Sequence, residues 1–247
     1  MGHANSFRGK YVMIAGADGA TGDAMIRAFA SERADIIAHS EKRTDSFEKM
    51  VKAISKEFNV NVFPVYFAMG DSDEIKRAIR SLMKEKKLVD VLINNIDGVH
   101  GRSFQLTSIT RIRDAFETDL FAWMDLTQMI LKMMVRNGRG TIVNIVSESG
   151  KLYSGECSAW GVSKSAVLAW TKTLAAEVGR QGIRVNAVAL RQAGRRIGES
   201  GEDDGGKETV AGIVTFLASG KASFVNGQTV KVDERQKLHK IRIHSKR

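Results

Sequence analysis

Short apolar runs rich in β-branched residues alternate along this chain with longer stretches in which apolar residues recur every three or four positions. The short runs mostly lack strict polar–apolar alternation, which is typical of strands buried on both faces. They predict strands over Lys10–Ala15, Asp35–His39, Asn61–Phe67, Val89–Asn94, Thr141–Ser147, Ile183–Ala189 and Thr229–Val232. The stretches between them predict helices near 22–32, 44–58, 71–86, 109–137, 158–180 and 207–218. This alternation predicts an α/β fold, a doubly wound parallel sheet with helices on both faces, whose ligands bind at the carboxyl ends of the strands.

The predicted helix over 109–137 carries a carboxylate in an unusual place. Its apolar residues form a stripe at helical spacing, and Asp119 lies on or beside that stripe. A buried carboxylate costs free energy unless a cation pairs with it or a cleft admits water to it. Asp119 is therefore a candidate functional residue. The alternative is a position at the edge of the stripe, in contact with water.

Length and composition favour one globular domain, which we place over residues 1–234. The chain has 247 residues, of which 43% are hydrophobic and 27% charged, as expected of a single α/β domain with a full core. No run approaches the roughly 18 apolar residues of a membrane span, and the short polar start has no signal-peptide pattern. We therefore expect no membrane partner. Cys157 is the one cysteine, which excludes an internal disulfide and favours a reducing, cytoplasmic setting.

The formal charge of +10 is concentrated at the end of the chain. Residues 235–247 hold six Lys or Arg and no acid, and without them the charge falls to +4. We interpret this basic C-terminal tail as a solvated end. The alternative is an arm that contacts an acidic partner, such as acyl carrier protein or nucleic acid. Since no nucleic-acid-binding motif accompanies the tail, we do not expect a nucleic-acid partner.

A glycine-rich loop follows the first predicted strand. Gly16, Gly19 and Gly22 lie between that strand and a predicted helix. In this context glycines permit a tight turn and a close approach of backbone N–H groups to a pyrophosphate. With Asp18 they make up the candidate phosphate loop. The negative charge of Asp18 counts against an anion there unless its side chain turns outward.

The end of the second predicted strand bears on the choice of cofactor. An acid there accepts hydrogen bonds from the ribose hydroxyls of NAD, whereas a small residue followed by basic residues suits the 2′-phosphate of NADP. Ser40, Lys42 and Arg43 favour NADP, and Glu41 favours NAD. The residues slightly favour NADP, with Ser40 and Arg43 as ligands, and a solvated turn of mixed charge is the alternative.

Three motifs in the second half of the chain carry a family resemblance. They read Thr-Ile-Val-Asn-Ile-Val-Ser over 141–147, Trp-Gly-Val-Ser-Lys over 160–164 and Gly-Ile-Arg-Val-Asn-Ala-Val-Ala over 182–189. Over most of its length the chain resembles the short-chain dehydrogenase/reductase family, most closely its 3-oxoacyl-ACP-reductase-like branch. The resemblance implies a Rossmann-type sheet of seven parallel strands and an NAD(P) cofactor. It also implies a homo-oligomer, a dimer or tetramer joined through helices 109–137 and 158–180.

The resemblance also assigns a candidate catalytic set. In the family a serine binds the substrate carbonyl and a tyrosine transfers the proton. A lysine one helical turn later assists the tyrosine and holds the nicotinamide ribose, and an asparagine on the preceding long helix supports a water chain to that lysine. Ser147 and Lys164 match the serine and the lysine, whereas Trp160 replaces the tyrosine and Asp119 replaces the asparagine. An indole N–H is a hydrogen-bond donor only, so Trp160 cannot act as a general acid or base.

Other departures from the family pattern surround the expected cofactor. Ala20 replaces a phosphate-loop glycine, Ala68 replaces an aspartate that receives the adenine amino group, and Leu190-Arg191 replaces a Pro-Gly pair. The stretch 94–97 reads Asn-Asn-Ile-Asp in place of Asn-Asn-Ala-Gly, and Asn95 in it remains a candidate cofactor ligand. The core-forming motifs persist while the residues around the cofactor change. This combination indicates a retained fold in which the standard hydride chemistry is relaxed.

Other residues are candidates to replace the missing tyrosine or to complete the site. Tyr153, in the loop after the fifth predicted strand, is a candidate substitute, although a loop tyrosine also packs or faces solvent. Cys157 and His100 lie near the expected mouth of the site, but no paired His and Asp accompanies them and no Cys/His spacing predicts a metal. If the helices lie as in the family, Asp119 pairs with the ammonium of Lys164 and neutralises a charge left without its tyrosine partner.

The sequence leaves four functions open, and the least favoured is nucleic-acid binding through the basic tail. The first is a divergent carbonyl reductase, NADP-linked or NAD-linked, that acts on an acyl-like or other small keto substrate. The second is a non-catalytic pseudoenzyme that acts as a subunit or binds a small molecule. The third is non-redox chemistry in the same cleft, with Tyr153 or Asp119 as the acid–base group. The residues favour the second or third over standard tyrosine-dependent reduction.

Overall fold

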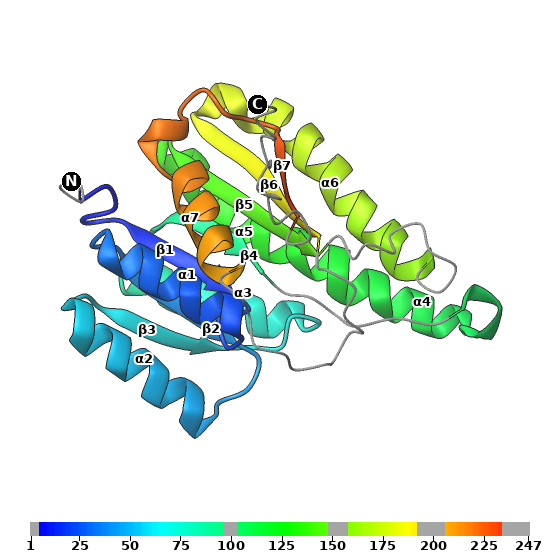
Figure 1. The fold of residues 1–247 in the computed structure, drawn as a ribbon, viewed down its shortest axis with the longest axis horizontal. Helices are drawn as coiled ribbons and strands as arrows, with labels where there is room; N and C mark the ends of the chain where they lie inside the picture. Colours follow the sequence, from blue (N-terminus) through cyan, green and yellow to red (C-terminus); the bar gives the residue numbers. More distant parts are fainter. Residues whose placement is uncertain (1–4, 96–102, 148–157, 192–205, 234–247) are drawn as a thin grey trace, which may run out of the picture.

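A computed structural model of the chain describes residues 5–95, 103–147, 158–191 and 206–233. The strands in this part of the chain form one parallel sheet of seven, in the order β3-β2-β1-β4-β5-β6-β7 (Figure 1). They are β1 (Tyr11–Ala15), β2 (Asp35–Ser40), β3 (Val62–Tyr66), β4 (Val89–Asn94), β5 (Gly140–Ser147), β6 (Ile183–Arg191) and β7 (Thr229–Asp233). The chain winds outward from β1 to β3 and then resumes at β4 on the other side of β1. The predicted doubly wound α/β fold of Rossmann type is confirmed, and its switch point lies between β1 and β4.

Helices cover both faces of the sheet, as predicted. They are α1 (Ala20–Ser31), α2 (Asp45–Phe58), α3 (Ser72–Lys84), α4 (Ile109–Phe116), α5 (Ala122–Asn137), α6 (Ser158–Val178) and α7 (Gly206–Ala218). Helices α1, α2 and α7 contribute to one hydrophobic cluster, and α3, α5 and α6 contribute to the other (Figure 1). Short 3₁₀ turns occur at Phe104–Leu106, Gly179–Gln181 and Gly220–Ala222. We did not predict these turns, since three residues are too few to show a period.

The central strands contribute side chains to both clusters. In β1, Val12 and Ile14 join the cluster under α1, α2 and α7, whereas Met13 and Ala15 join the cluster under α3, α5 and α6. Successive residues of a strand point to opposite faces. A strand covered on both faces is therefore apolar at every position, and this is why the strands were recognisable as unbroken apolar runs.

The predicted helix over 109–137 is interrupted. A π-helical turn, Glu117–Phe121, separates α4 from α5, and the Ala122 N–H donates to the Glu117 carbonyl across five residues. A π turn accommodates one extra residue per turn and is frequent at functional sites. It lies where Asp119 and Leu120 are buried. The apolar residues continue at steps of three or four across this segment, so their spacing gave no sign of the insertion.

A chain of buried amides and hydroxyls ties the middle of the sheet to α5 and α6. The Asn94 amide donates to Asn144 Oδ1 (2.8 Å) and to Thr127 Oγ1 (3.2 Å), and the Asn144 amide donates to Thr171 Oγ1 (2.9 Å). Buried polar groups that satisfy one another fix the packing of the elements that carry them. Helix α6, which carries Trp160 and Lys164, and helix α5, which follows the turn with Asp119, are thus held against β4 and β5.

Several predicted features lie outside the described residues. These are the basic tail over 235–247 and the candidates Tyr153, Cys157 and His100. The division into a domain over 1–234 and a tail therefore stays a prediction. Among the helices in the described ranges, none has the length and apolar character that crossing a bilayer requires.

Candidate active site

The candidate phosphate loop leaves β1 at the switch point and enters α1. Gly16 has φ +76°, which favours glycine. A Cβ added to Gly22 would lie 2.5 Å from the carbonyl atoms of Ala17, so only glycine allows α1 to approach the loop this closely. Asn95, at the end of β4, donates from its side chain to the Gly16 carbonyl (2.8 Å). Gly16, Gly22 and Asn95 are thus brought together as predicted, with Asn95 bracing the loop.

The backbone N–H groups at the start of α1 have no side-chain cap and can donate to a ligand in the phosphate loop. Gly19 is its N-cap and supplies no side-chain hydrogen bond. The first N–H groups of a helix have no intrahelical acceptor and carry a partial positive charge. Backbone donors in this position suit a pyrophosphate. This geometry fits the cofactor phosphates even though Ala20 replaces a family glycine.

His39, which the sequence analysis did not single out, holds the loop from the neighbouring strand. It is buried in β2, where its Nδ1 accepts from the Gly16 N–H (3.2 Å) and its backbone carbonyl accepts from the Ala17 N–H (2.8 Å). Its Nε2 lies 2.9 Å from the Phe67 carbonyl. Since Nδ1 accepts, Nε2 carries the proton and donates to that carbonyl. A histidine in an apolar strand, one position before its end, was the sequence signal for this role.

The pKa of His39 gives a testable pH dependence. Burial lowers this pKa below its ordinary value of 6.5, although Asp18 and Glu41 nearby act in the opposite direction. The unfolded chain therefore takes up a proton near pH 6.5 while the folded chain resists it. We expect the free energy of unfolding to be fully retained above this pH and to fall as the pH decreases below it. Urea unfolding at about pH 8 and about pH 5 measures the difference, and His39→Gln, which does not titrate, should reduce it. An equal pH dependence in the variant would contradict this account.

Acidic side chains occupy the end of β2, where an adenosine ribose is expected. The Ser40 hydroxyl donates to Asp18 Oδ2 (2.8 Å), so the Asp18 carboxylate lies against the end of β2. Glu41 accepts from the Met69 N–H (3.3 Å). Arg43 pairs with Glu48 (3.1 Å), and its guanidinium lies 5.8 Å from the Tyr66 ring centroid. The predicted ligands of a 2′-phosphate, Ser40 and Arg43, are therefore both engaged by carboxylates of the chain.

A buried ion pair forms the other half of the site. Lys164 Nζ lies 3.6 Å from Asp119 Oδ1, and their side chains are 1% and 0% exposed. Ser163 Oγ lies 3.4 Å from Asp119 Oδ2, although its nearer acceptor is the Trp160 carbonyl at 2.8 Å. The predicted pairing of Asp119 with Lys164 is confirmed. The alternative position of Asp119 in contact with water is wrong, because the π turn directs this residue into the core.

Two tryptophans enclose the ammonium of Lys164. Its Nζ lies 5.5 Å from the Trp123 ring centroid and 6.0 Å from that of Trp160, within the range of cation–π attraction. Trp160 and Lys164 therefore share one face of α6, as their spacing predicted. Both indole N–H groups are buried and have no hydrogen-bond acceptor among the described residues. Trp160 can thus donate a hydrogen bond to a ligand oxygen, but its N–H does not ionise near neutral pH and cannot serve as a general acid.

Ser147 ends β5 beside Leu190 of β6, so its backbone lies at the carboxyl edge of the sheet as predicted. The Asp119–Lys164 ion pair joins the π turn to α6. The phosphate loop lies at the same carboxyl edge, since it follows the end of β1. No group of His, Cys, Asp and Glu suited to a metal ion occurs within the described ranges.

Comparisons with known proteins agree with this geometry. A family model described as short chain dehydrogenase matches residues 10–193. The chain is 31% identical to a 7alpha-hydroxysteroid dehydrogenase of Bacteroides fragilis, over 95% of this chain and 97% of that protein. It is also 31% identical to a 3-oxoacyl-[acyl-carrier-protein] reductase of Thermotoga maritima, over 91% of this chain and 96% of that protein. An L-sorbose reductase from Gluconobacter frateurii, solved with NADPH and L-sorbose, has the same fold, with a TM-score of 0.81 and 21% identity over 92% of this chain and 96% of that chain.

Proposed function

Because this chain belongs to the short-chain dehydrogenase/reductase family, we propose that it binds a nicotinamide cofactor and a small carbonyl- or hydroxyl-bearing ligand without the family's tyrosine-dependent hydride chemistry. The observation that carries this proposal is Trp160. A buried indole occupies the position of the proton donor, and the neighbouring Lys164 is paired with Asp119. General acid–base assistance contributes about 10²–10⁴-fold to rate, so a site without it retains binding and loses most turnover.

The residues at the switch point fit the phosphates of a dinucleotide. The Gly22 contact and the positive φ of Gly16 bring the loop backbone close to the start of α1, which has no side-chain cap. When bound, a nicotinamide supplies or accepts a hydride. At the ribose end, Asn95 and Lys164 are the candidate ligands. Lys164 is turned toward Asp119, so we expect its contribution to cofactor affinity to be small.

The acidic end of β2 favours NAD over NADP. Asp18 is held there by Ser40, where its carboxylate can accept from the ribose hydroxyls, and Glu41 adds a second negative charge. A 2′-phosphate would meet both charges. We therefore propose that the slight preference for NADP that the sequence suggested is reversed by the direction of Asp18.

Fluorescence titration with NADH and NADPH tests cofactor binding and selectivity together. We expect NADH to bind more tightly, since NADPH brings a 2′-phosphate close to two carboxylates. Asp18→Asn should weaken the binding of NADH by about tenfold, as expected for the loss of one charge-assisted hydrogen bond. The difference in affinity between NADH and NADPH should become smaller as a result. Asp23→Asn is the matched control, because Asp23 lies in the first turn of α1, just after the loop that carries Asp18, and pairs with Arg27. Tighter binding of NADPH would overturn the selectivity, and no binding of either cofactor would overturn the proposed function.

The ligand class follows from the family and from Trp160. The two relatives at 31% identity are named for a hydroxysteroid and a 3-oxoacyl thioester, both members of an alcohol–ketone pair. A free indole N–H suits the oxygen of either form. We propose that Trp160 donates to this oxygen, with Ser147 beside it as in the family.

A second candidate function, carbonyl reduction in the ordinary sense, is favoured by those relatives, which match more than nine-tenths of the chain. It requires another proton donor, for which Tyr153 is the candidate. Turnover of a 3-oxoacyl thioester with NADH or NADPH separates the two functions. Family-level turnover that persists in Tyr153→Phe would contradict our assignment of Trp160, whereas turnover lost in Tyr153→Phe would establish the second candidate.

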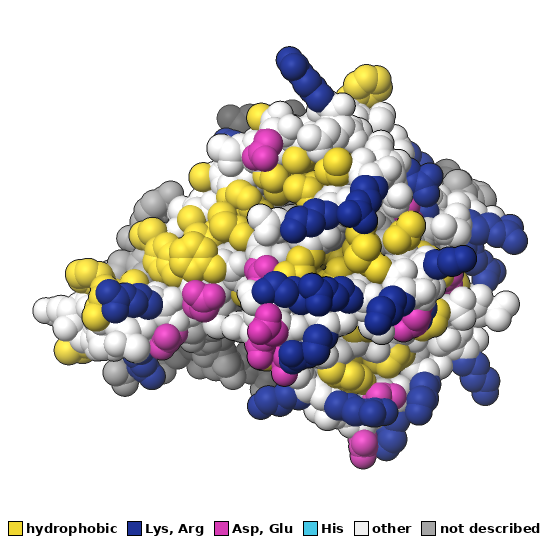
Figure 2. Space-filling view, turned by 180° about the vertical axis from the view of Figure 1, so that it is seen from behind, with side chains coloured by type: hydrophobic (Ala, Val, Ile, Leu, Met, Phe, Trp, Pro, Cys, Tyr) yellow, Lys and Arg dark blue, Asp and Glu magenta, His cyan; other side chains and the backbone are white. Residues whose placement is uncertain are grey.

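We also propose that the chain assembles as a homo-oligomer through α4, α5 and α6. Figure 2 views the side of the molecule that carries α3, α5 and α6, and hydrophobic side chains gather there toward the end that carries α4. The large exposed hydrophobic residues on or next to these helices include Phe104, Leu106, Ile109, Phe121, Val135 and Val162. Exposed hydrophobic side chains that gather on one side of a molecule favour an interface there. Light scattering of the purified protein decides between monomer, dimer and tetramer.

A further inference from the structure

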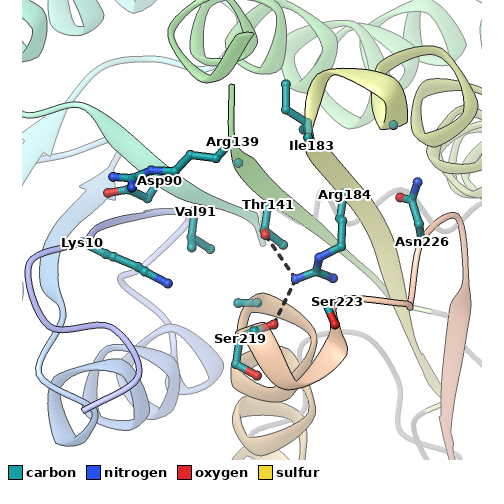
Figure 3. A pocket seen from close by; sticks show the side chains of 15 residues that line it. Lys10, Asp90, Val91, Arg139, Thr141, Ile183, Arg184, Ser219, Ser223 and Asn226 are labelled. Carbon is teal, nitrogen blue, oxygen red and sulfur yellow. Dashed lines mark hydrogen bonds and ion pairs between the residues drawn. The ribbon is translucent and has the colours of Figure 1, made fainter. Parts of the chain in front are cut away.

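A pocket of about 440 Å³, lined by several charged side chains, lies at the edge of the sheet opposite the candidate active site (Figure 3). Its walls are the residue before β1, the starts of β4, β5 and β6, and the turn after α7. Parallel strands all begin at one edge and end at the other, so the length of the strands separates this pocket from the phosphate loop. The residues of the site described above do not line it.

The pocket has more positive than negative charge. Lys10, Arg139 and Arg184 line it together with a single acid, Asp90. Arg139 donates to Asp90 Oδ1 (3.1 and 3.2 Å), and the Tyr11 N–H donates to Asp90 Oδ2 (3.1 Å). The carboxylate is therefore neutralised by Arg139 and engaged through both oxygens. Two cations, Lys10 and Arg184, remain without an acid that compensates them.

Arg184 is held rigidly by neutral acceptors. Its Nη2 donates to the carbonyls of Leu217 (2.7 Å) and Ser219 (3.1 Å) and to Thr141 Oγ1 (3.3 Å), and its Nη1 donates to the Val225 carbonyl (3.1 Å). Two of these carbonyls belong to the end of α7 and the turn after it, so the guanidinium also caps that helix. The Nε–H and one Nη1 hydrogen make no bond to the described residues.

No carboxylate in the described part of the chain forms an ion pair with Arg184 or with Lys10. Burial lowers the pKa of Arg184, and no acid opposes that effect. Arg27 shows the contrast, because Asp23 and Glu57 pair with it and raise its pKa. Figure 3 shows the amino group of Lys10 directed into the pocket from the side facing Arg184. An oxyanion between them would neutralise both charges and accept the free guanidinium hydrogens.

We propose that this pocket binds the phosphate group of a small molecule. Phosphate carries about two negative charges near neutral pH, which matches the two uncompensated cations. The volume exceeds that of inorganic phosphate and leaves room for an organic remainder. The site is independent of the nicotinamide cofactor and of the chemistry at Trp160, so it stands or falls separately from the proposed function.

Isothermal titration calorimetry with inorganic phosphate, at constant ionic strength, tests the site. Lys10→Gln should weaken binding by about tenfold to a hundredfold, as expected for a hydrogen bond to a charged group. Gly220→Glu should also weaken it, because a Cβ at Gly220 meets no atom within 4 Å and the added carboxylate repels the anion. Lys52→Gln is the control, since Lys52 is an exposed lysine of α2 outside the pocket. Urea midpoints establish that each variant is folded.

Hydrogen exchange locates the bound phosphate without reliance on either variant. Protection confined to peptides over 218–226 supports the proposal. Protection confined to peptides over 16–24 places the anion in the phosphate loop and overturns it. The proposal is also overturned if phosphate does not bind, or if Lys10→Gln binds phosphate as tightly as wild type does. It is overturned as well if Lys52→Gln loses as much phosphate affinity as Lys10→Gln does.

Discussion

Trp160→Tyr combined with Asp119→Asn is expected to raise nicotinamide-dependent reduction of a 3-oxoacyl thioester or an oxo-steroid by about 10²–10⁴-fold over the wild-type protein. Tyrosine restores a hydroxyl that can exchange its proton. Asparagine removes the charge that holds Lys164 Nζ at 3.6 Å, which leaves the ammonium free to act on that hydroxyl. Steady-state rates with purified variants measure the change.

The single variants and a phenylalanine control separate the two contributions. Trp160→Tyr alone should gain less than the combined variant, because Lys164 stays paired with Asp119. Trp160→Phe combined with Asp119→Asn should gain nothing, since the phenyl ring has no hydroxyl. An equal gain with phenylalanine, or a wild-type protein that is already as fast as the combined variant, would show that position 160 does not limit the chemistry.

Asp119→Ala is expected to lower the free energy of unfolding by about 3–5 kcal/mol, since removal of one partner leaves a buried charge uncompensated. Lys164 is only 1% exposed, so water cannot readily replace the carboxylate. The rings of Trp123 and Trp160 remain near the ammonium and offset part of the loss. Urea unfolding followed by tryptophan fluorescence or circular dichroism measures the change.

Lys164→Met combined with Asp119→Ala should recover most of the lost free energy of unfolding, because this double variant contains neither charge. Buried ion pairs are often replaced by apolar side chains without a net loss. Asp114→Ala is the matched control, since Asp114 is an exposed aspartate of the adjacent helix α4. If Asp119→Ala proves as mild as Asp114→Ala, the pair contributes nothing to stability and its importance lies in the site alone.

The order of strands and helices could be read from the sequence because burial on both faces leaves an unbroken apolar run. The glycine loop and the replacement of tyrosine by Trp160 were equally visible, since each depends on residues close together in the chain. The shared face of Trp160 and Lys164 follows from a separation of four residues on one helix. Even the pairing of Asp119 with Lys164 could be proposed, once the resemblance placed the two helices side by side.

The side-chain contacts that the sequence did not predict depend on contacts between segments far apart in the chain. The π turn that directs Asp119 inward, the bond from the Gly16 N–H to His39 and the direction of Asp18 toward Ser40 all depend on how strands and helices meet. The pocket at the starts of the strands joins residues from Lys10 to Asn226. Periodicity shows which side of an element is buried but not which side chains meet across the interface, because one step of register exchanges every neighbour. The partners of Asp18 and Arg184 were therefore decided by the tertiary structure.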